Sequence, residues 1–170
     1  FDHTSFADIA DNVGLSRGNF YHHFKSKDDI LAAVIDLRLQ RTQSMLNEWE
    51  AACEDPIARI GCYIRILIAN RAKITLYGCP VGTLTTELAK LDHVHKPAAN
   101  RIFSLFIGWL TIQFENAGRV ECAKDLALQV MSWSQGVATM AAAFQDEAYI
   151  DREVSQKTEW LNTTLNSPSK

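Results

Sequence analysis

Apolar residues recur every three or four positions along most of this chain, which is the spacing of one face of an α-helix. The segment that follows Pro56 shows this spacing most clearly, at Ile57, Ile60, Ile64 and Leu67. No alternating strand pattern with a hairpin turn signal interrupts the helical pattern. Three of the four prolines stand where one periodic segment ends and another begins. The chain is therefore predicted to be all-α.

The periodic segments and their breaks predict helices over about 4–11, 15–22, 26–53, 56–77, 80–90, 93–117, 121–146 and 149–165. Ser26 followed three residues later by Asp29 is a capping box at the start of the third of these. Pro56 is tolerated at a first helical position. Gly118 is suited to end the helix before it, since glycine readily takes a positive φ. The tail at 167–170 is expected to be frayed.

Composition excludes several classes of protein. Hydrophobic residues make up 47% of the chain, enough for a sizeable core, yet no apolar run reaches membrane-spanning length. The first residues lack the basic start of a signal peptide, so we expect a soluble cytoplasmic protein without membrane contact. Two histidines, His93 and His95, point to different sides of a helix and are interpreted as a solvated turn. We therefore expect no metal and no cofactor.

The four cysteines, Cys53, Cys62, Cys79 and Cys122, form no Cys-x-x-Cys pair, which disfavours a zinc finger. Free thiols are the simplest interpretation. The sequence also has no nucleophile elbow, phosphate loop, zinc-protease motif or dinucleotide fingerprint, so it is not predicted to be an enzyme.

The stretch from Thr4 to Lys27 has the spacing of a helix-turn-helix. Ala10 is small where two short helices would cross, and Gly14, four residues later, can take the positive φ of a sharp turn. Phe20 is apolar where the second helix meets its core. The small hydrophobic wedge is completed by Ile9, Val13, Leu15 and Phe24.

The second short helix is left with a polar surface that suits nucleic acid. Its exposed positions are predicted to be Ser16, Arg17, Gly18, Asn19, Tyr21 and His22, with Lys27 at the start of the next helix. Arginine can grip guanine and asparagine can pair with adenine in the major groove, whereas lysine suits phosphate. Because the net charge is −3, any DNA contact must come from such a local patch.

The same stretch resembles the DNA-binding domain of TetR/AcrR-type regulators. The resemblance rests on Ile9-Ala10, Gly14, Ser16, Gly18, Phe20-Tyr21, His23-Phe24 and Ser26-Lys27, at the spacing of that family's hallmark run. It implies double-stranded DNA as a partner, with contacts from Thr4, Ser16, Arg17, Asn19, Tyr21, His22 and Lys27, and with Thr4 capping the first helix. The family has a further helix before this motif, so we expect one upstream of Phe1.

The resemblance further implies a homodimer formed by the last two helices and an unidentified small-molecule effector that loosens a repressor from a palindromic operator. We expect a DNA-binding domain with the start of a linking helix over 1–48 and an effector-binding and dimerisation domain over 49–166. The half-sites should lie about one helical turn, or a small multiple, apart.

Several residues in the C-terminal part have two interpretations. The aromatic side chains of Trp49, Tyr63, Phe103, Phe106, Trp109 and Trp133 either form core or line an effector pocket. The small residues after position 137 favour close helix packing, either within one chain or at a dimer interface comprising Val130, Val137, Ala138, Ala141, Ala142, Trp160 and Leu161. Cys79, beside a helix start, is either inert or a redox thiol.

The sequence therefore predicts a DNA-binding transcriptional regulator, most simply a repressor released by an effector. One alternative is a repressor on the same scaffold that senses oxidants or electrophiles through Cys79. The other, from a different class, is a helical protein-interaction module without DNA binding.

Overall fold

The protein is described from a computed structural model that covers residues 5–14, 18 and 22–166. Over these ranges the regular structure is helical and no strand occurs, so the all-α prediction is confirmed. The elements are α1 (Phe6–Asn12), α3 (Lys27–Ala52), α4 (Pro56–Ala69), α5 (Arg71–Tyr77), α6 (Pro80–Lys90), α7 (Lys96–Asn116), the 3₁₀ turn η1 (Val120–Cys122), α8 (Ala123–Phe144) and α9 (Glu147–Asn166).

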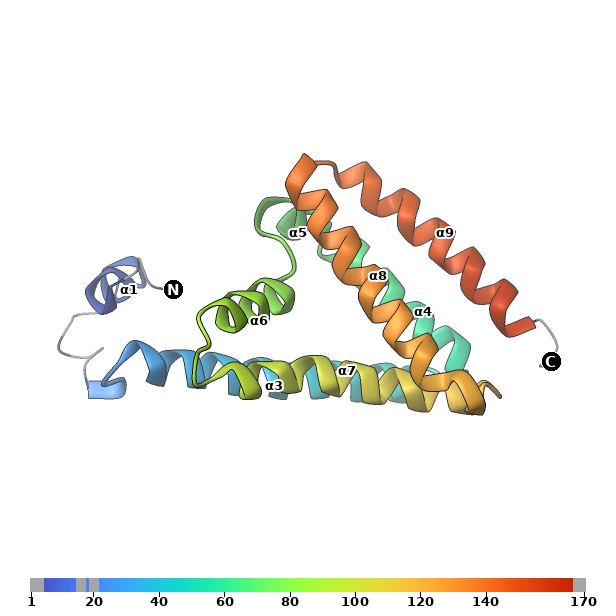
Figure 1. Ribbon diagram of the computed structural model, residues 1–170, viewed down its shortest axis with the longest axis horizontal. Coiled ribbons are helices and arrows are strands. Elements are labelled where there is room, and N and C mark those ends of the chain that lie inside the picture. The colour runs from blue at the N-terminus through green and yellow to red at the C-terminus, as the bar shows by residue number, and fades with distance from the viewer. Residues whose placement is uncertain (1–4, 15–17, 19–21, 167–170) are drawn as a thin grey trace.

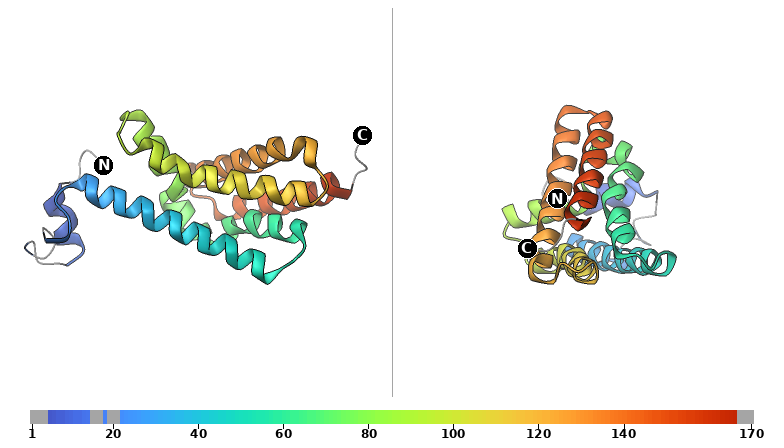
Figure 2. Two further views of the ribbon diagram at one scale, coloured as in Figure 1. Left: turned by 90° about the horizontal axis from the view of Figure 1, so that it is seen from below. Right: turned by 90° about the vertical axis from the view of Figure 1, so that its right-hand side faces the viewer.

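The helices form an elongated body with α1 at one end. The long α3 and α7 lie against each other, α8 crosses from the end of α7, and α9 returns beside α8 and packs on α4 (Figure 1). Helix α1 lies beyond the start of α3, away from α8 and α9 (Figure 2). The main core joins α3, α4, α7, α8 and α9 through side chains such as Ile64, Leu110 and Phe114, all fully buried.

A second, smaller core lies near the start of α3. It consists of Leu31, Ile35, Leu88 and Ala99, from α3, α6 and α7. These contacts tie the N-terminal half of α3 to the rest of the body. Since α3 continues across the domain boundary predicted at residue 48, the two parts share one helix.

The helix starts follow the capping chemistry read from the sequence, with one correction. Ser26 caps α3 in a capping box with Asp29, and Asp55 caps α4 ahead of Pro56. The first helix, however, is capped by Ser5 and not by Thr4: the Ser5 hydroxyl accepts from the Asp8 N–H, and the Asp8 carboxylate accepts from the Ser5 N–H. Ser5 stands three residues before a carboxylate, as a capping box requires.

The predicted helix 56–77 is wrong in one respect, because it is broken at Asn70. The Asn70 backbone has φ −114° and ψ 9°, and its side-chain amide donates to the Ile66 carbonyl at 2.9 Å. Asparagine competes in this way with the helical hydrogen bonds of its own backbone. The break separates α4 from α5 and turns α5 toward α8 and α9.

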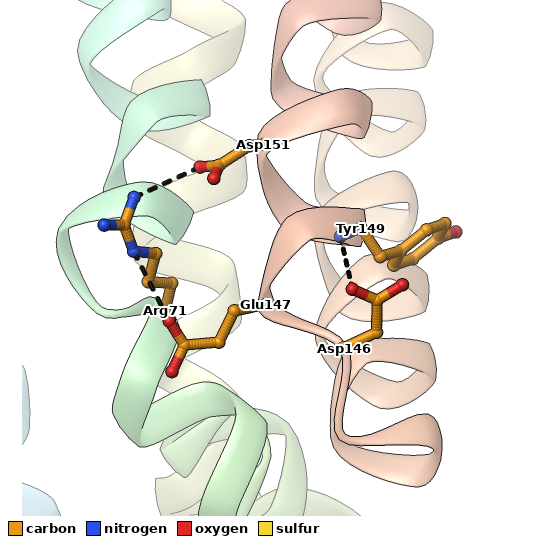
Figure 3. Close-up of polar contacts among 5 residues, drawn as sticks. All are labelled: Arg71, Asp146, Glu147, Tyr149 and Asp151. Atoms are coloured by element: carbon orange, nitrogen blue, oxygen red, sulfur yellow. Dashed lines mark hydrogen bonds and ion pairs between the residues drawn. The ribbon is translucent and has the colours of Figure 1, made fainter.

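Ion pairs attach the start of α9 to α5. The Arg71 guanidinium lies 3.5 Å from the Glu147 carboxylate and 3.3 Å from that of Asp151, one turn further along α9 (Figure 3). Asp146 precedes the helix and accepts from the Tyr149 N–H at 3.0 Å. No helix among the described residues is long and apolar enough to cross a membrane.

Candidate DNA-binding segment and ligand cavity

The turn after α1 has the geometry that the helix-turn-helix spacing predicts. Gly14 has φ +69°, a conformation in which a Cβ would be strained, and Ala10 is completely buried. Val13 departs from the prediction: it is 59% exposed and does not join the hydrophobic wedge. It follows α1 directly, in the turn, so its side chain is no longer on the helix face that Ala10 buries.

The residues predicted to contact DNA are only partly within the described chain. Thr4, Ser16, Arg17, Asn19 and Tyr21 lie outside it, as do Leu15 and Phe20 of the wedge. Gly18 is exposed, and a Cβ added to it would meet nothing within 4 Å. His22 is exposed with its ring edge-on to His23, and Lys27 is the first residue of α3. These contacts remain predictions.

The start of α3 is fixed by one carboxylate. Asp29 accepts from the Lys25 N–H at 2.8 Å and from the Ser26 N–H at 3.1 Å, while its own N–H donates to the Ser26 hydroxyl at 3.1 Å. This network satisfies backbone donors that a helix start otherwise leaves open. It holds Lys27 at a defined place at the start of α3.

A histidine of the loop between α6 and α7 also contacts the start of α3. The His93 Nε2 lies 3.3 Å from a carboxylate oxygen of Asp28, and its Nδ1 accepts from the His95 N–H at 3.2 Å. The His93 side chain is only 14% exposed, so the solvated-turn interpretation is wrong for this residue. No cluster of His, Cys, Asp and Glu within the described ranges could hold a metal ion.

A cavity of about 480 Å³ lies in the C-terminal body. Three of the six aromatic residues considered for a pocket line it: Tyr63, Phe103 and Phe106. Tyr63 and Phe106 meet edge-on with ring centroids 5.4 Å apart. Its volume is in the range of small-molecule sites.

The other three aromatic residues lie elsewhere, because each tryptophan has a partner away from the cavity. Trp49 packs on Trp109 at 5.7 Å, and the Trp109 indole N–H donates to Glu50 at 2.8 Å. The Trp133 indole N–H donates to Glu153 on α9 at 3.2 Å. These tryptophans bind helices together and do not line the cavity.

A buried hydrogen-bonded chain closes the deep end of the cavity. The Tyr63 hydroxyl lies 2.9 Å from the Ser134 oxygen, and the Ser134 hydroxyl donates to the Met131 carbonyl at 2.8 Å. Tyr63 is therefore the donor of the first bond. Burial raises the pKa of the Tyr63 hydroxyl well above its ordinary value, so the group stays protonated at any physiological pH.

The sequence interpretation missed the part of the lining that α3 provides. Val34, Leu37, Arg38, Arg41, Thr42 and Met45 all line the cavity. Their spacing places them on one face of the helix. The apolar members were recognisable as a helix face, but nothing local in the sequence indicates that a cavity would lie there.

Cys79 lies at the wall of the cavity. It is the N-cap of α6, and its sulfur accepts from the Gly82 N–H at 3.5 Å. The position next to a helix start is as predicted, whereas its reactivity remains a prediction.

The residues predicted for the dimer interface divide into two groups. Val130, Val137, Ala138, Ala141 and Leu161 are at most 2% exposed within a single chain, so they have no surface to offer a second copy. Here the intrachain interpretation is correct, because α8 packs closely on α7 and α9. Ala142 and Trp160 are only half-buried and stay available to a partner.

Comparison with known proteins identifies the N-terminal segment. Residues 1–34 match the sequence model of bacterial regulatory proteins, tetR family. Over this range the chain resembles the tetR family. The matched range contains α1, the Gly14 turn and the capped start of α3, which are the features derived above from the residues.

Two curated proteins are similar to this chain over part of its length. The chain is 35% identical over 103 residues to an uncharacterized HTH-type transcriptional regulator in the lacX 3'region of Lactococcus lactis subsp. lactis, covering 59% of this chain and 53% of that protein. It is 30% identical over 103 residues to the HTH-type transcriptional repressor DhaR of Mycobacterium sp. (strain GP1), covering 59% and 50%. The chain thus matches about half the length of these relatives.

Solved structures extend the likeness from the N-terminal segment to the fold of the chain. A TetR transcriptional regulator from Legionella pneumophila superposes with a TM-score of 0.79 at 23% identity, over 96% of this chain and 87% of that one. A TetR-family regulator from Agrobacterium tumefaciens gives 0.78 at 23% identity, over 92% and 85%. At this identity they establish the shared architecture.

Proposed function

We propose that the protein is a transcriptional regulator that binds double-stranded DNA at specific sequences. The observation that supports this best is the match of residues 1–34 to the tetR family together with the matching geometry of α1, the Gly14 turn and the α3 cap. Its base readers are Arg17 and Asn19, and Lys27 binds phosphate. The protein works on DNA and so in the cytoplasm.

A homodimer is proposed as the DNA-binding form. Helix α8 keeps apolar surface that the single chain does not cover: Leu128 is 40%, Met140 44% and Phe144 72% exposed. With the half-buried Trp160 and Ala142, these side chains can pack against a second copy related by a two-fold axis. Such a dimer would present two recognition helices to a palindromic operator.

Repression relieved by a small molecule is the proposed mode of action. DhaR, a relative, is named a repressor. In this chain the cavity of about 480 Å³ is bordered by α3, the helix that also follows the DNA-binding segment. A ligand that shifts α3 would change the spacing of the two readers, and by linkage DNA would weaken ligand binding by the same factor.

Selection of random duplex DNA by the full-length protein at near-physiological salt tests the regulator. We expect enrichment of a two-fold symmetric site. A folded, dimeric protein that enriches no sequence would favour the helical protein-interaction module instead.

The position of Cys79 at the cavity wall supports a second candidate, a repressor that senses oxidants or electrophiles. Cys79→Ser separates the two. If mild peroxide releases the wild type from its operator but not the variant, the thiol is the sensor. If both are released alike, Cys79 is not the sensor, and if peroxide releases neither, the small-molecule mode stands.

A further inference from the structure

The cavity has an unusual charge balance. Two arginines, Arg38 and Arg41, stand on its α3 side, and no Asp or Glu of the described chain lines it. Neither guanidinium has a hydrogen bond or ion pair with any described residue. The two lie three residues apart on one helix face, where like charges repel. An anion held between them would remove that repulsion.

Most of the rest of the lining is apolar or hydrogen-bonded within the chain. Deep in the cavity Leu67, Ile74 and Phe106 are buried hydrocarbon surfaces. The Tyr63 hydroxyl donates to the Ser134 oxygen, and the Ser134 hydroxyl donates to the Met131 carbonyl. The Gln135 amide N–H also donates to the Ser134 oxygen, at 3.4 Å. These polar groups hydrogen-bond to one another, so a ligand needs no polar atom at the deep end of the cavity.

The two arginines and the deepest side chains of the cavity also lie at different depths. Arg41, Val34 and Leu37 are exposed and Arg38 is half-buried, whereas Tyr63, Leu67 and Phe106 are buried. A molecule that fits both ends has its charge near the α3 rim and its hydrocarbon inside. Guanidinium pairs well with a carboxylate, whose two oxygens match its planar donors.

We propose that this cavity binds an amphipathic carboxylate, with its hydrocarbon part against Phe106 and Leu67 and its carboxylate on Arg38 and Arg41. This rests on the proposed effector mode and specifies its ligand class. Because both arginines belong to α3, a carboxylate bound to them contacts directly the helix that begins at the DNA-binding segment.

Binding of three probes that share one hydrocarbon chain tests the charge preference: decanoate, decanol and decylamine, each below its micelle concentration. Calorimetric titration of the full-length protein without DNA gives the affinities. A charge-assisted contact at a partly exposed site predicts that decanoate binds about tenfold more tightly than decanol. Decylamine is expected to bind more weakly than either.

Three variants locate the preference. Arg38→Met and Arg41→Met together should bring decanoate and decanol to equal affinity, while Arg38→Lys with Arg41→Lys should retain part of the difference. Arg101→Met is the matched control, since Arg101 is an exposed arginine of α7 outside the cavity. Within the described part of the chain these three side chains have no hydrogen-bond or ion-pair partner, so the variants should fold, which circular dichroism checks.

Equal binding of decanoate and decanol by the wild type, tighter binding of decylamine, or no binding of any probe would overturn the proposal. So would a decanoate preference that survives the double Met variant. Because no DNA is present, these results are independent of the duplex selection, and the carboxylate proposal can fail while the regulator stands.

Discussion

Replacing Ser134 by alanine should destabilise the protein by more than the loss of one hydrogen bond. Tyr63 is 3% exposed and Ser134 2%, and the Tyr63 hydroxyl donates to the Ser134 oxygen at 2.9 Å. In Ser134→Ala that donor keeps only the Met131 sulfur, 3.2 Å away, which is a weak acceptor. A buried donor without a good acceptor costs about 1–3 kcal/mol.

Tyr63→Phe provides the matched half of a double-mutant cycle. It removes the donor itself, so it should cost only about 1 kcal/mol in free energy of unfolding. In the double variant no orphaned donor remains, and the combined cost should fall short of the sum of the two by about 1 kcal/mol.

Urea denaturation followed by circular dichroism measures all three variants. Strictly additive costs would refute the reasoning, because they would show that water in the cavity satisfies the Tyr63 hydroxyl as well as Ser134 does.

Three further predictions concern stability. Burial raises the pKa of Tyr63 above its ordinary value of 10.0, so the contribution of the neutral hydroxyl to folding stability is complete below pH 10.0 and is lost as the pH rises further. Tyr63→Phe should therefore lose less stability than the wild type in an alkaline titration followed by thermal unfolding. Asp29→Ala removes the α3 capping box and should cost about 1 kcal/mol by urea denaturation, whereas the exposed Asp36→Ala on the same helix should cost little; equal effects would contradict the capping role. Leu110→Ala, at a fully buried position, should lower the free energy of unfolding by about 2–5 kcal/mol. A change of under about 1 kcal/mol would mean that the core near α7 is loosely packed. Ile112→Ala, half exposed on the same helix, is the control.

The helix starts and most helix ends could be predicted from the sequence because they depend on local chemistry. Ser26 with Asp29, Asp55 before Pro56, and Gly118 with φ +80° are each recognisable within a few residues. The break at Asn70 was missed, because the apolar stripe of α4 resumes in α5 with Ile74 and hides the competing side-chain bond.

The cavity and the dimer surface depend on tertiary packing and could be predicted only in part. Tyr63 and Trp109 are both aromatic residues on apolar helix faces, yet Tyr63 faces the cavity while Trp109 is held by Glu50. The small residues of α8 fit either a dimer interface or a contact within the chain, and Ala138 is buried inside the chain. No local signal separates these cases, since only the packing of distant helices decides which face is covered.

The measurement that tests the central claim most directly is the affinity of the protein for its selected duplex relative to a scrambled duplex, in the wild type and in Arg17→Ala with Asn19→Ala. For the wild type we predict a ratio of about a thousandfold or more at physiological salt. Each lost base contact should lower it by about tenfold or more, while the dimer stays folded and binding to the scrambled duplex changes little. An unchanged ratio of the two affinities in the folded double variant would contradict the claim that the segment containing Arg17 and Asn19 reads the DNA sequence.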